Sequence, residues 1–383
     1  MSRLQAEHLY KVFGKRPEDA VQKLESGADR DELRAEGTTA AVIDATFTVE
    51  PGQIFVVMGL SGSGKSTLLR MLNGLLEPTA GRVLFDDQDL TALSPSELRG
   101  VRSSKISMVF QHFALFPHRS VLENVGYGLE VQGIPREERL KRATEALELA
   151  GLKGWEKSWP DELSGGMQQR VGLARALATD ADLLLMDESF SALDPLIRRD
   201  MQDQLLELQK RLKKTIVFIT HDLNEAMRLG DRIAVMRDGR IVQMGTAEDI
   251  LVTPANDYVA SFTQDVDRSR VLTAGAIMAD PDTAFGTRTD EGASLRTADD
   301  VLKAAPATVT ADTPIIELFT PCSTSSAPVA VIDPDGRLTG VVPRSRLLAV
   351  LGEPMTPGDA PKASADTVVP MSVNSVSKVI AGA

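Results

Sequence analysis

Cysteine is almost absent from this sequence of 383 residues, because Cys322 is the single example. One thiol excludes an internal disulfide and fits a reducing compartment such as the cytosol. Long apolar runs are absent too, since no stretch approaches the roughly 18 residues that cross a bilayer. The first residues are charged and are not followed by a long apolar region, so we expect no signal peptide. Any role at a membrane is therefore expected to depend on a partner.

An excess of positive charge is also missing. The chain has 42 Lys and Arg residues against 54 Asp and Glu residues, which gives a formal net charge of −12. General nucleic-acid binding needs a basic face that neutralises phosphates, so nucleic acid is not an expected partner. The apolar fraction of 43% and the charged fraction of 25% are typical of soluble globular proteins. The length leaves room for two or three domains.

The most informative stretch is QIFVVMGLSGSGKSTLL at residues 53–69, which reads as strand, glycine-rich loop and helix. The glycines let backbone N–H groups approach an anion, and the helix that begins near Lys65 adds the positive end of its dipole. Lys65 can reach the β- and γ-phosphates of a nucleotide, and Ser66 can hold Mg²⁺. A glycine-rich turn before a core helix is the alternative. The residues expected to bind are Gly59, Ser61, Gly62, Ser63, Gly64, Lys65, Ser66 and Thr67.

Two adjacent carboxylates follow the apolar run LLLM at residues 183–186. A continuous apolar strand is typical of a parallel sheet covered on both faces, and ligands sit at the carboxyl ends of such strands. Asp187 can therefore bind Mg²⁺, and Glu188 can act as the general base that polarises the attacking water. The alternative is an acidic pair in a solvated loop.

A second candidate anion site is LSGGMQQR at residues 163–170. Ser164 is placed as a helix N-cap, and Gly165 and Gly166 bare the backbone N–H groups beside it. An ordinary capped helix is the alternative.

The order of these motifs resembles that of the ATP-binding cassette (ABC) ATPases over roughly residues 1–265. Walker A at 59–66, Gln111 after a strand, the signature at 163–170, Walker B at 183–188, the D-loop SALD at 191–194 and a switch histidine at His221 follow one another. The resemblance implies an α/β P-loop NTPase with a RecA-like α/β core, an antiparallel β subdomain and a helical subdomain at about 112–162.

The resemblance also implies roles for matching residues, with ATP and Mg²⁺ as cofactors. Phe13 would stack on adenine, with Tyr10 as the rival. Gln111 would sense Mg²⁺ and the attacking water and couple to a membrane permease that docks near Phe110–Phe116, and His221 would bond the γ-phosphate. Ser164, Gly165 and Gly166 would meet ATP bound by a second cassette, which implies a homodimer. The implied catalytic residues are Lys65, Gln111, Glu188 and His221, and the implied Mg²⁺ ligands are Ser66, Gln111 and Asp187.

The insertion at about residues 14–40 resembles that of ATPases in quaternary-amine importers, which take up glycine betaine, proline or choline. So do SALDPLIRRDMQ at 191–202 and TIVFITHDLNEAMRLGDRIAVMRDGRIVQMGT at 215–246. This implies a peripheral subunit at the cytoplasmic face of the membrane, working with permease subunits and, indirectly, a substrate-binding protein. An importer ATPase for a polar amino acid or a polyamine, a non-transport ABC ATPase and a regulatory protein with a vestigial ATPase are the alternatives.

The C-terminal part is predicted to be separate. Residues 307–351 resemble one CBS motif, a small α+β unit with the order β-α-β-β-α. Residues 266–306 read as a linker or a degenerate CBS element, and 352–383 as a flexible tail. Where the CBS family would want Ser/Thr and Asp after Gly340, this chain has Pro343 and Arg346. A packing or dimer-contact module is therefore favoured over an adenosine-ligand site.

Overall fold

The computed structural model describes residues 2–263, 266–284 and 297–352. The chain divides into two compact units, residues 1–242 and 243–383. This division comes before the boundary at residue 265 that the sequence suggested, because α10 (Ala247–Val252) packs with α11 (Asp257–Thr263) and α12 (Arg268–Val271) in the second unit. The predicted domain limits stay a prediction.

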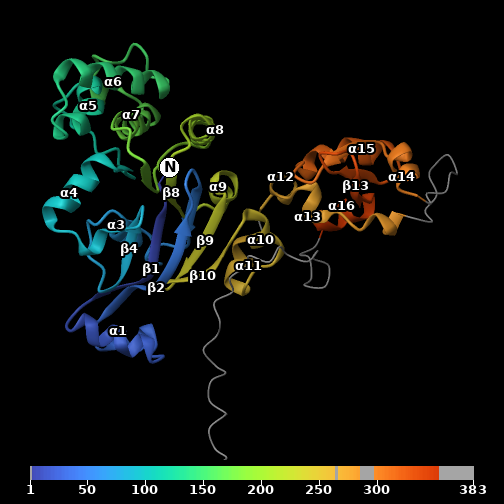
Figure 1. Cartoon of the computed structure of the whole chain (residues 1–383), viewed down its shortest axis with the longest axis horizontal. Coiled ribbons are helices and arrows are strands. Elements are labelled where there is room, and N and C mark those ends of the chain that lie inside the picture. The colour runs from blue at the N-terminus through green and yellow to red at the C-terminus, as the bar shows by residue number, and fades with distance from the viewer. Residues whose placement is uncertain (1, 264–265, 285–296, 353–383) are drawn as a thin grey trace, which may run out of the picture. The chain divides into compact units, whose positions relative to one another are not determined.

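The first unit contains three groups of elements (Figure 1). Its strands are β1 (Leu4–Phe13), β2 (Thr39–Val49), β3 (Ile54–Met58), β4 (Ala80–Phe85), β5 (Gln88–Asp89), β6 (Ile106–Val109), β7 (Leu183–Asp187), β8 (Thr215–Thr220), β9 (Arg232–Arg237) and β10 (Arg240–Gly245), the last of which runs into the second unit. Its helices are α1 (Pro17–Glu25), α2 (Arg30–Ala35), α3 (Lys65–Leu72), α4 (Pro95–Ser104), α5 (Val121–Val131), α6 (Arg136–Leu149), α7 (Gly165–Ala178), α8 (Pro195–Leu212) and α9 (Leu223–Leu229), with 3-10 turns at Leu90–Ala92 and Pro160–Glu162.

A six-stranded sheet in the order β10-β9-β3-β8-β7-β6 forms the centre of this unit. The pairs β9-β3, β3-β8, β8-β7 and β7-β6 are parallel. All five residues of β3 and all six of β8 are buried, which explains why β3 and the four central residues of β8 are continuous apolar runs in the sequence. The carboxyl ends of β3, β7 and β8 therefore meet at one edge, where a ligand site is expected.

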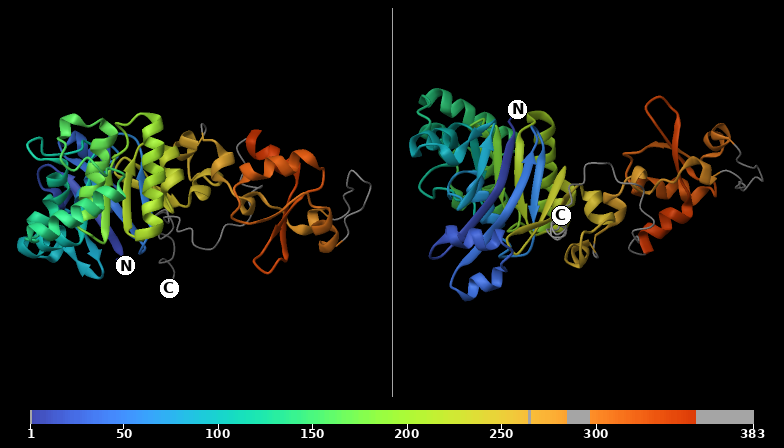
Figure 2. Two further views of the ribbon diagram at one scale, coloured as in Figure 1. Left: turned by 90° about the horizontal axis from the view of Figure 1, so that it is seen from above. Right: turned by 60° about the horizontal axis from the view of Figure 1, so that its bottom comes forward.

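A second sheet, in the order β2-β1-β4-β5, is antiparallel. Its blue strands lie beside the larger sheet in both views of Figure 2. Phe47 on β2 stacks on Phe55 on β3, with ring centroids 4.8 Å apart. This contact packs the two sheets together and places β2 next to the loop that follows β3.

The helical part of this unit comprises α5, α6 and α7, which gather at one end of it (Figure 1). Their apolar faces share one core. Asn124 is fully buried there, and its side chain bonds the backbone of Phe116, Arg119 and Ser120. These hydrogen bonds offset the cost of burying the amide and fix the loop before α5.

The insertion between β1 and β2 is folded. Helices α1 and α2 bury Val21, Leu24 and Leu33 against Tyr10 and Ile43 of the antiparallel sheet. A capping box of Asp29 and Glu32 begins α2. The insertion is thus anchored on the sheet through its own apolar core.

The second unit holds a three-stranded sheet in the order β11-β12-β13. Its further elements are α13 (Ala274–Ile277), α14 (Ala298–Ala304), β11 (Thr308–Thr310), α15 (Phe319–Thr324), β12 (Val329–Ile332), β13 (Leu338–Val342) and α16 (Arg344–Gly352), with 3-10 turns at Pro281–Ala284 and Ile315–Leu318. Strand β11 pairs with β12 in parallel, and β12 with β13 antiparallel. The element order matches the predicted β-α-β-β-α pattern, while the CBS resemblance itself stays a prediction.

The segment predicted as a linker or degenerate element packs on this sheet. Thr273 bridges to Pro314 and Ala279 to Val341, and Val301 is buried against the last two. Its residues 285–296 and the predicted tail from residue 353 lie outside the described residues.

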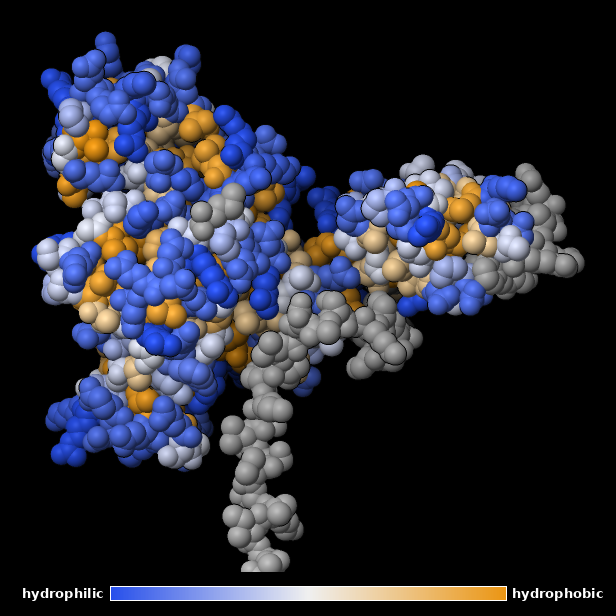
Figure 3. Space-filling model, viewed as in Figure 1, coloured by the Kyte–Doolittle hydropathy of each residue, from blue (hydrophilic) through white to orange (hydrophobic). Residues whose placement is uncertain are grey.

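Among the described residues, no helix is long and apolar enough to cross a membrane. On the face shown in Figure 3, apolar residues form small patches between polar ones.

Candidate functional site: a phosphate cradle facing a glutamate

The loop between β3 and α3 has the backbone that its glycines permit. Gly59, Gly62 and Gly64 have φ angles of 150°, 80° and 105°, which side-chain-bearing residues rarely adopt. A Cβ on Gly59 would lie 2.2 Å from the carbonyl oxygen of Met236, and one on Gly64 would lie 2.2 Å from that of Ala41. These two glycines are required by close packing against β9 and β2, whereas Gly62 faces open space.

The turn between β9 and β10 supports this loop from the side. The backbone N–H of Gly239 donates to the carbonyl of Ser63 at 3.0 Å, and the N–H of Ile43 donates to the carbonyl of Gly239 at 2.8 Å. Asp238 precedes this glycine with a left-handed φ of 51°. The cradle is therefore held by chain segments far away in the sequence.

Lys65 begins α3, and its side chain is only 4% exposed. Its Nζ donates to the carbonyls of Gly59 at 2.9 Å and Leu60 at 3.1 Å, and lies 3.7 Å from Oε1 of Glu188. Burial lowers the pKa of Lys65, while the nearby charge and hydrogen bond of Glu188 act to raise it. The ammonium is thus held at the mouth of the loop.

Ser66 and Asp187 meet across the end of the sheet. The hydroxyl of Ser66 donates to Oδ1 of Asp187 at 3.1 Å. Burial raises the pKa of Asp187, and the hydrogen bond from Ser66 partly opposes this. A hydroxyl and a carboxylate side by side are oxygen donors of the kind that Mg²⁺ prefers.

Glu188 is where the predicted catalytic residues converge. Its Oε2 contacts Nδ1 of His221 at 3.1 Å and accepts from Nε2 of Gln111 at 3.4 Å. Lys65 approaches the other oxygen, as described above. Glu188 has a φ of 43°, in the left-handed region, and its N–H donates to the carbonyl of Ile219 at 3.0 Å. The strained backbone turns this side chain toward the loop.

Six of the eight residues predicted to form the cradle line one cavity of about 240 Å³, whereas Gly59 and Ser63 do not. It is lined by Ser61, Gly62, Gly64, Lys65, Ser66, Thr67 and Glu188, together with Arg30, Thr39 and Ala41. The first seven were identified from the sequence. The last three were not, because nothing in the sequence indicated that the insertion would fold back beside the loop.

Of the two candidate aromatics, Phe13 is 44% exposed and pairs in register with Thr39. Tyr10 is 6% exposed and belongs to the core under the insertion. The ring of Phe13 is thus the more accessible of the two to a base, and the ammonium of Lys11 lies 5.4 Å from its centroid.

Ser164 caps α7, with its hydroxyl accepting from the N–H of Met167 at 3.4 Å. Gly165 lies beside the ring of Phe113, and Gly166 beside Ile197. Within the described part of the chain, no hydrogen bond or ion pair joins these residues to the phosphate cradle. The structure thus builds the cradle from one set of motifs and places the LSGGM segment at a separate position.

Comparison with known proteins gives one result throughout. Residues 42–191 match the family model described as ABC transporter. The chain is 49% identical over 388 residues to the glycine betaine transport ATP-binding protein OpuAA of Bacillus subtilis, covering 91% of this chain and 92% of that protein. It is 46% identical over 389 residues to the glycine betaine/proline betaine transport system ATP-binding protein ProV of Escherichia coli, covering 91% and 97%.

Solved structures agree in fold. A dimeric bacterial ABC transporter cassette is 33% identical, with a TM-score of 0.54, and the match covers 64% of this chain and 98% of that one. The same cassette has been solved as a dimer in a post-hydrolysis state bound to ADP and Pi, with the same TM-score of 0.54. The predicted P-loop ABC cassette fold and the predicted ATPase are confirmed, and the chain belongs to the ABC transporter family of ATP-binding proteins, in the group that includes the glycine betaine transport ATP-binding proteins.

Proposed function

We propose that this chain is the ATP-hydrolysing subunit of an importer for betaine-type solutes, with Glu188 as the general base. The observation that carries the catalytic part is the convergence of Lys65, Gln111 and His221 on the Glu188 carboxylate. A carboxylate that lies at hydrogen-bond distance from Gln111 and His221 and faces the Lys65 ammonium can accept the proton of a water that attacks the γ-phosphate. Lys65 and the N–H groups of the loop stabilise the charge on the phosphates.

Residues at the cradle also fit Mg²⁺. Ser66 and Asp187 provide adjacent oxygen donors, and the side-chain amide of Gln111 adds a third near Glu188. When bound there, Mg²⁺ supplies neutralisation of phosphate charge. The raised pKa of Asp187 supports this assignment, because a buried carboxylate gains from a cation beside it.

Two copies are proposed to share each ATP site. Ser164, Gly165 and Gly166 have bare N–H groups at a helix start and form no described hydrogen bond or ion pair with their own cradle. The matched cassette structures are dimeric. We assign these residues to the ATP held by a second copy, and Phe13 to its adenine.

The share of this chain that each relative matches supports a betaine-type solute. The betaine relatives match 91–92% of this chain, whereas a methionine import ATP-binding protein of Rhodococcus jostii with 49% identity matches 61%. The likeness to betaine transporters thus includes the C-terminal unit. We propose that the chain works at the cytoplasmic face of the membrane, on permease subunits that dock near Phe110–Phe116 and receive solute from a binding protein.

Replacing Glu188 with Gln tests the catalytic part. The variant keeps the shape of the side chain but removes the base, so steady-state ATP hydrolysis by purified chain should fall by about 10²-fold or more while ATP binding persists. Glu145→Gln, an exposed change on α6, should match the wild type. Hydrolysis near the wild-type rate in Glu188→Gln would refute the assignment of the base.

The solute class needs a test in cells. Uptake of labelled glycine betaine, choline and proline should be lost when the reading frame is deleted and restored by the wild type but not by Glu188→Gln. If the deletion left the uptake of all three solutes unchanged, the betaine class would be excluded.

A further inference from the structure

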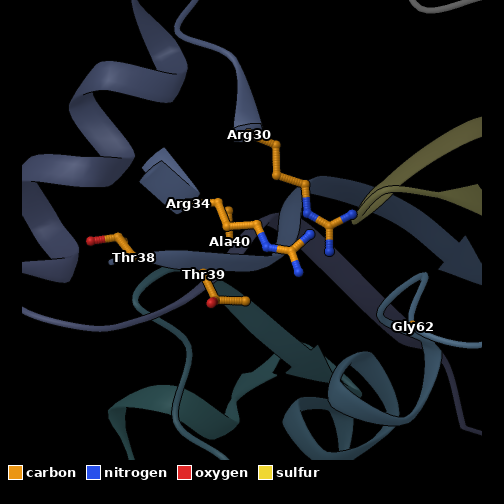
Figure 4. Close-up of a pocket in the computed structure, with 6 residues that line it drawn as sticks. All are labelled: Arg30, Arg34, Thr38, Thr39, Ala40 and Gly62. Atoms are coloured by element: carbon orange, nitrogen blue, oxygen red, sulfur yellow. The ribbon is translucent and has the colours of Figure 1, made fainter. Parts of the chain in front are cut away.

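Two arginines of the insertion line a cavity beside the phosphate cradle. Arg30 and Arg34, both on α2, share this cavity of about 390 Å³ with Thr38, Thr39, Ala40 and Gly62. Both guanidinium groups extend into the space between α2 and the loop that carries Gly62 (Figure 4). We refer to this cavity as the arginine pocket.

The arginine pocket adjoins the cradle. Arg30, Thr39 and Gly62 line it and also line the cavity that contains Lys65 and Ser66. Gly62 belongs to both because its Cα faces open space, with no atom within 4 Å of an added Cβ. An anion seated on the loop would therefore be open to α2 on this side.

The two arginines differ in their partners. Nη1 of Arg30 lies 2.7 Å from Oδ1 of Asp238, so its charge is partly compensated. The side chain of Arg34 is exposed and forms no ion pair within the part of the chain that the structure describes. Two guanidinium groups and the Lys65 ammonium line the joined cavities, where Glu188 is the one carboxylate. This concentration of positive charge suits a polyanion.

Helix α2 is held in a defined place relative to the loop. Leu33 is 1% exposed in the core under the insertion, and Arg30 reaches the turn at Asp238. That same turn donates from Gly239 to Ser63 of the loop. The arginines are thus positioned by the element that also positions the cradle. A guanidinium presents a planar fork of donors that matches phosphate in two bonds at once.

We propose that Arg34, supported by Arg30, binds the phosphate chain of the nucleotide held by the cradle, which makes the insertion an additional wall of the ATP site. This inference rests on the proposed ATPase function. Because the Arg34 side chain is exposed to solvent, we expect it to increase the affinity for ATP and to have little effect on the chemical step.

The test is ATP binding by the full-length chain. Isothermal titration with ATP and Mg²⁺ should show about five- to tenfold weaker binding for Arg34→Ala, which lies in the range for one hydrogen bond and suits a side chain that solvent screens. The KM for ATP should rise by a similar factor, with kcat within about twofold of the wild type, since uniform binding is lost. Arg34→Lys should restore part of the affinity. Arg99→Ala, which removes an exposed arginine from α4 with the same change in charge, should bind like the wild type.

Two further measurements make the result unambiguous. Thermal unfolding without nucleotide should be the same for wild type and Arg34→Ala, because the side chain has no described ion pair to lose. The wild-type affinity should fall more steeply with salt than that of Arg34→Ala.

The proposal would be overturned if Arg34→Ala bound ATP as tightly as the wild type and Arg99→Ala do. It would also be overturned if pyrophosphate bound in the arginine pocket without any effect on the affinity for ATP. Lys65→Ala distinguishes a failure of this proposal from a failure of the proposed ATPase function. If the wild type binds ATP, Lys65→Ala does not, and Arg34→Ala is unchanged, only the role of the insertion is refuted. If the wild type itself binds no ATP, the proposed function fails first.

Discussion

At the scale of single residues, the site holds charges that burial disfavours. Asp187 and Lys65 are both partly removed from water. Burial raises the pKa of Asp187 and lowers that of Lys65, which favours the neutral form of each side chain. Neither pKa shift stabilises the folded chain when no nucleotide is bound. Both residues are useful once phosphate and a cation are present, because the opposite charge then offsets the loss of water.

Asp187→Asn should therefore make the nucleotide-free chain more stable while it weakens Mg²⁺-dependent hydrolysis. Removal of an unfavourable buried charge should raise the melting temperature by roughly 2–4 °C, the shift that corresponds to about 1 kcal/mol. Differential scanning fluorimetry without nucleotide measures it. Asp200→Asn, an exposed change on α8, is the matched control.

The stability gained in Asp187→Asn should also depend on pH. A raised folded-state pKa means that folded Asp187 keeps its proton more firmly than the unfolded chain, with its reference value of 3.8. Its favourable contribution is present below that value and is lost as the pH rises through the folded-state pKa. The advantage of Asp187→Asn should thus be larger at pH 8 than at pH 4.5. An equal advantage at both values would contradict the role given to burial.

At the scale of elements, the sequence predicted the strands and helices of the site closely. The apolar runs at residues 54–58 and 183–186 indicate strands, and the structure has β3 and β7 there, because both runs have the length of a strand and end at residues that break the apolar pattern. The start of α3 at Lys65 and the cap at Ser164 followed from glycine and serine chemistry.

The position of α2 could not be predicted. Four of the six residues of α2 are charged, which favours solvent exposure and fits the exposed Arg34, but the contact of Arg30 with Asp238 spans 208 residues. Nothing local in either segment indicates such a contact. The support of the loop by Gly239 cannot be predicted for the same reason, although the Asp238-Gly239 pair between two apolar runs is a hairpin signal in the sequence.

The ion pair of Arg30 with Asp238 should steady α2 to a small extent. Asp238→Asn tolerates the left-handed backbone and removes the charge, so amide hydrogen exchange in residues 30–35 should become about two- to fivefold faster, as expected for an exposed pair. Exchange in α5 should not change. Unaltered protection of α2 would indicate that its apolar contacts alone hold it in place.

At the scale of the whole molecule, the separate positions of the cradle and the LSGGM segment lead to a prediction about pairs of chains. Lys65→Ala and Ser164→Arg should each be inactive alone. If every site combines the cradle of one copy with Ser164 of another, a mixed dimer keeps one intact site. An equal mixture should then recover about a quarter of the wild-type rate, given random pairing and independent sites.

The measurement is ATP hydrolysis after the two purified variants are mixed and allowed to exchange. Mixing Lys65→Ala with Lys65→Met is the control, because both lack the same half of the site. No recovery in the first mixture would indicate that each chain carries a self-contained pocket.

The support of the cradle by the hairpin after β9 has a consequence for biosynthesis. The glycines of the loop are seated against carbonyls of residues 41 and 236, and Ser63 accepts its bond from Gly239. Roughly 175 residues must leave the ribosome between the loop and that hairpin, which takes about 9–35 s at about 5–20 residues per second. A nascent chain therefore lacks this part of the support of its cradle until the hairpin has been made.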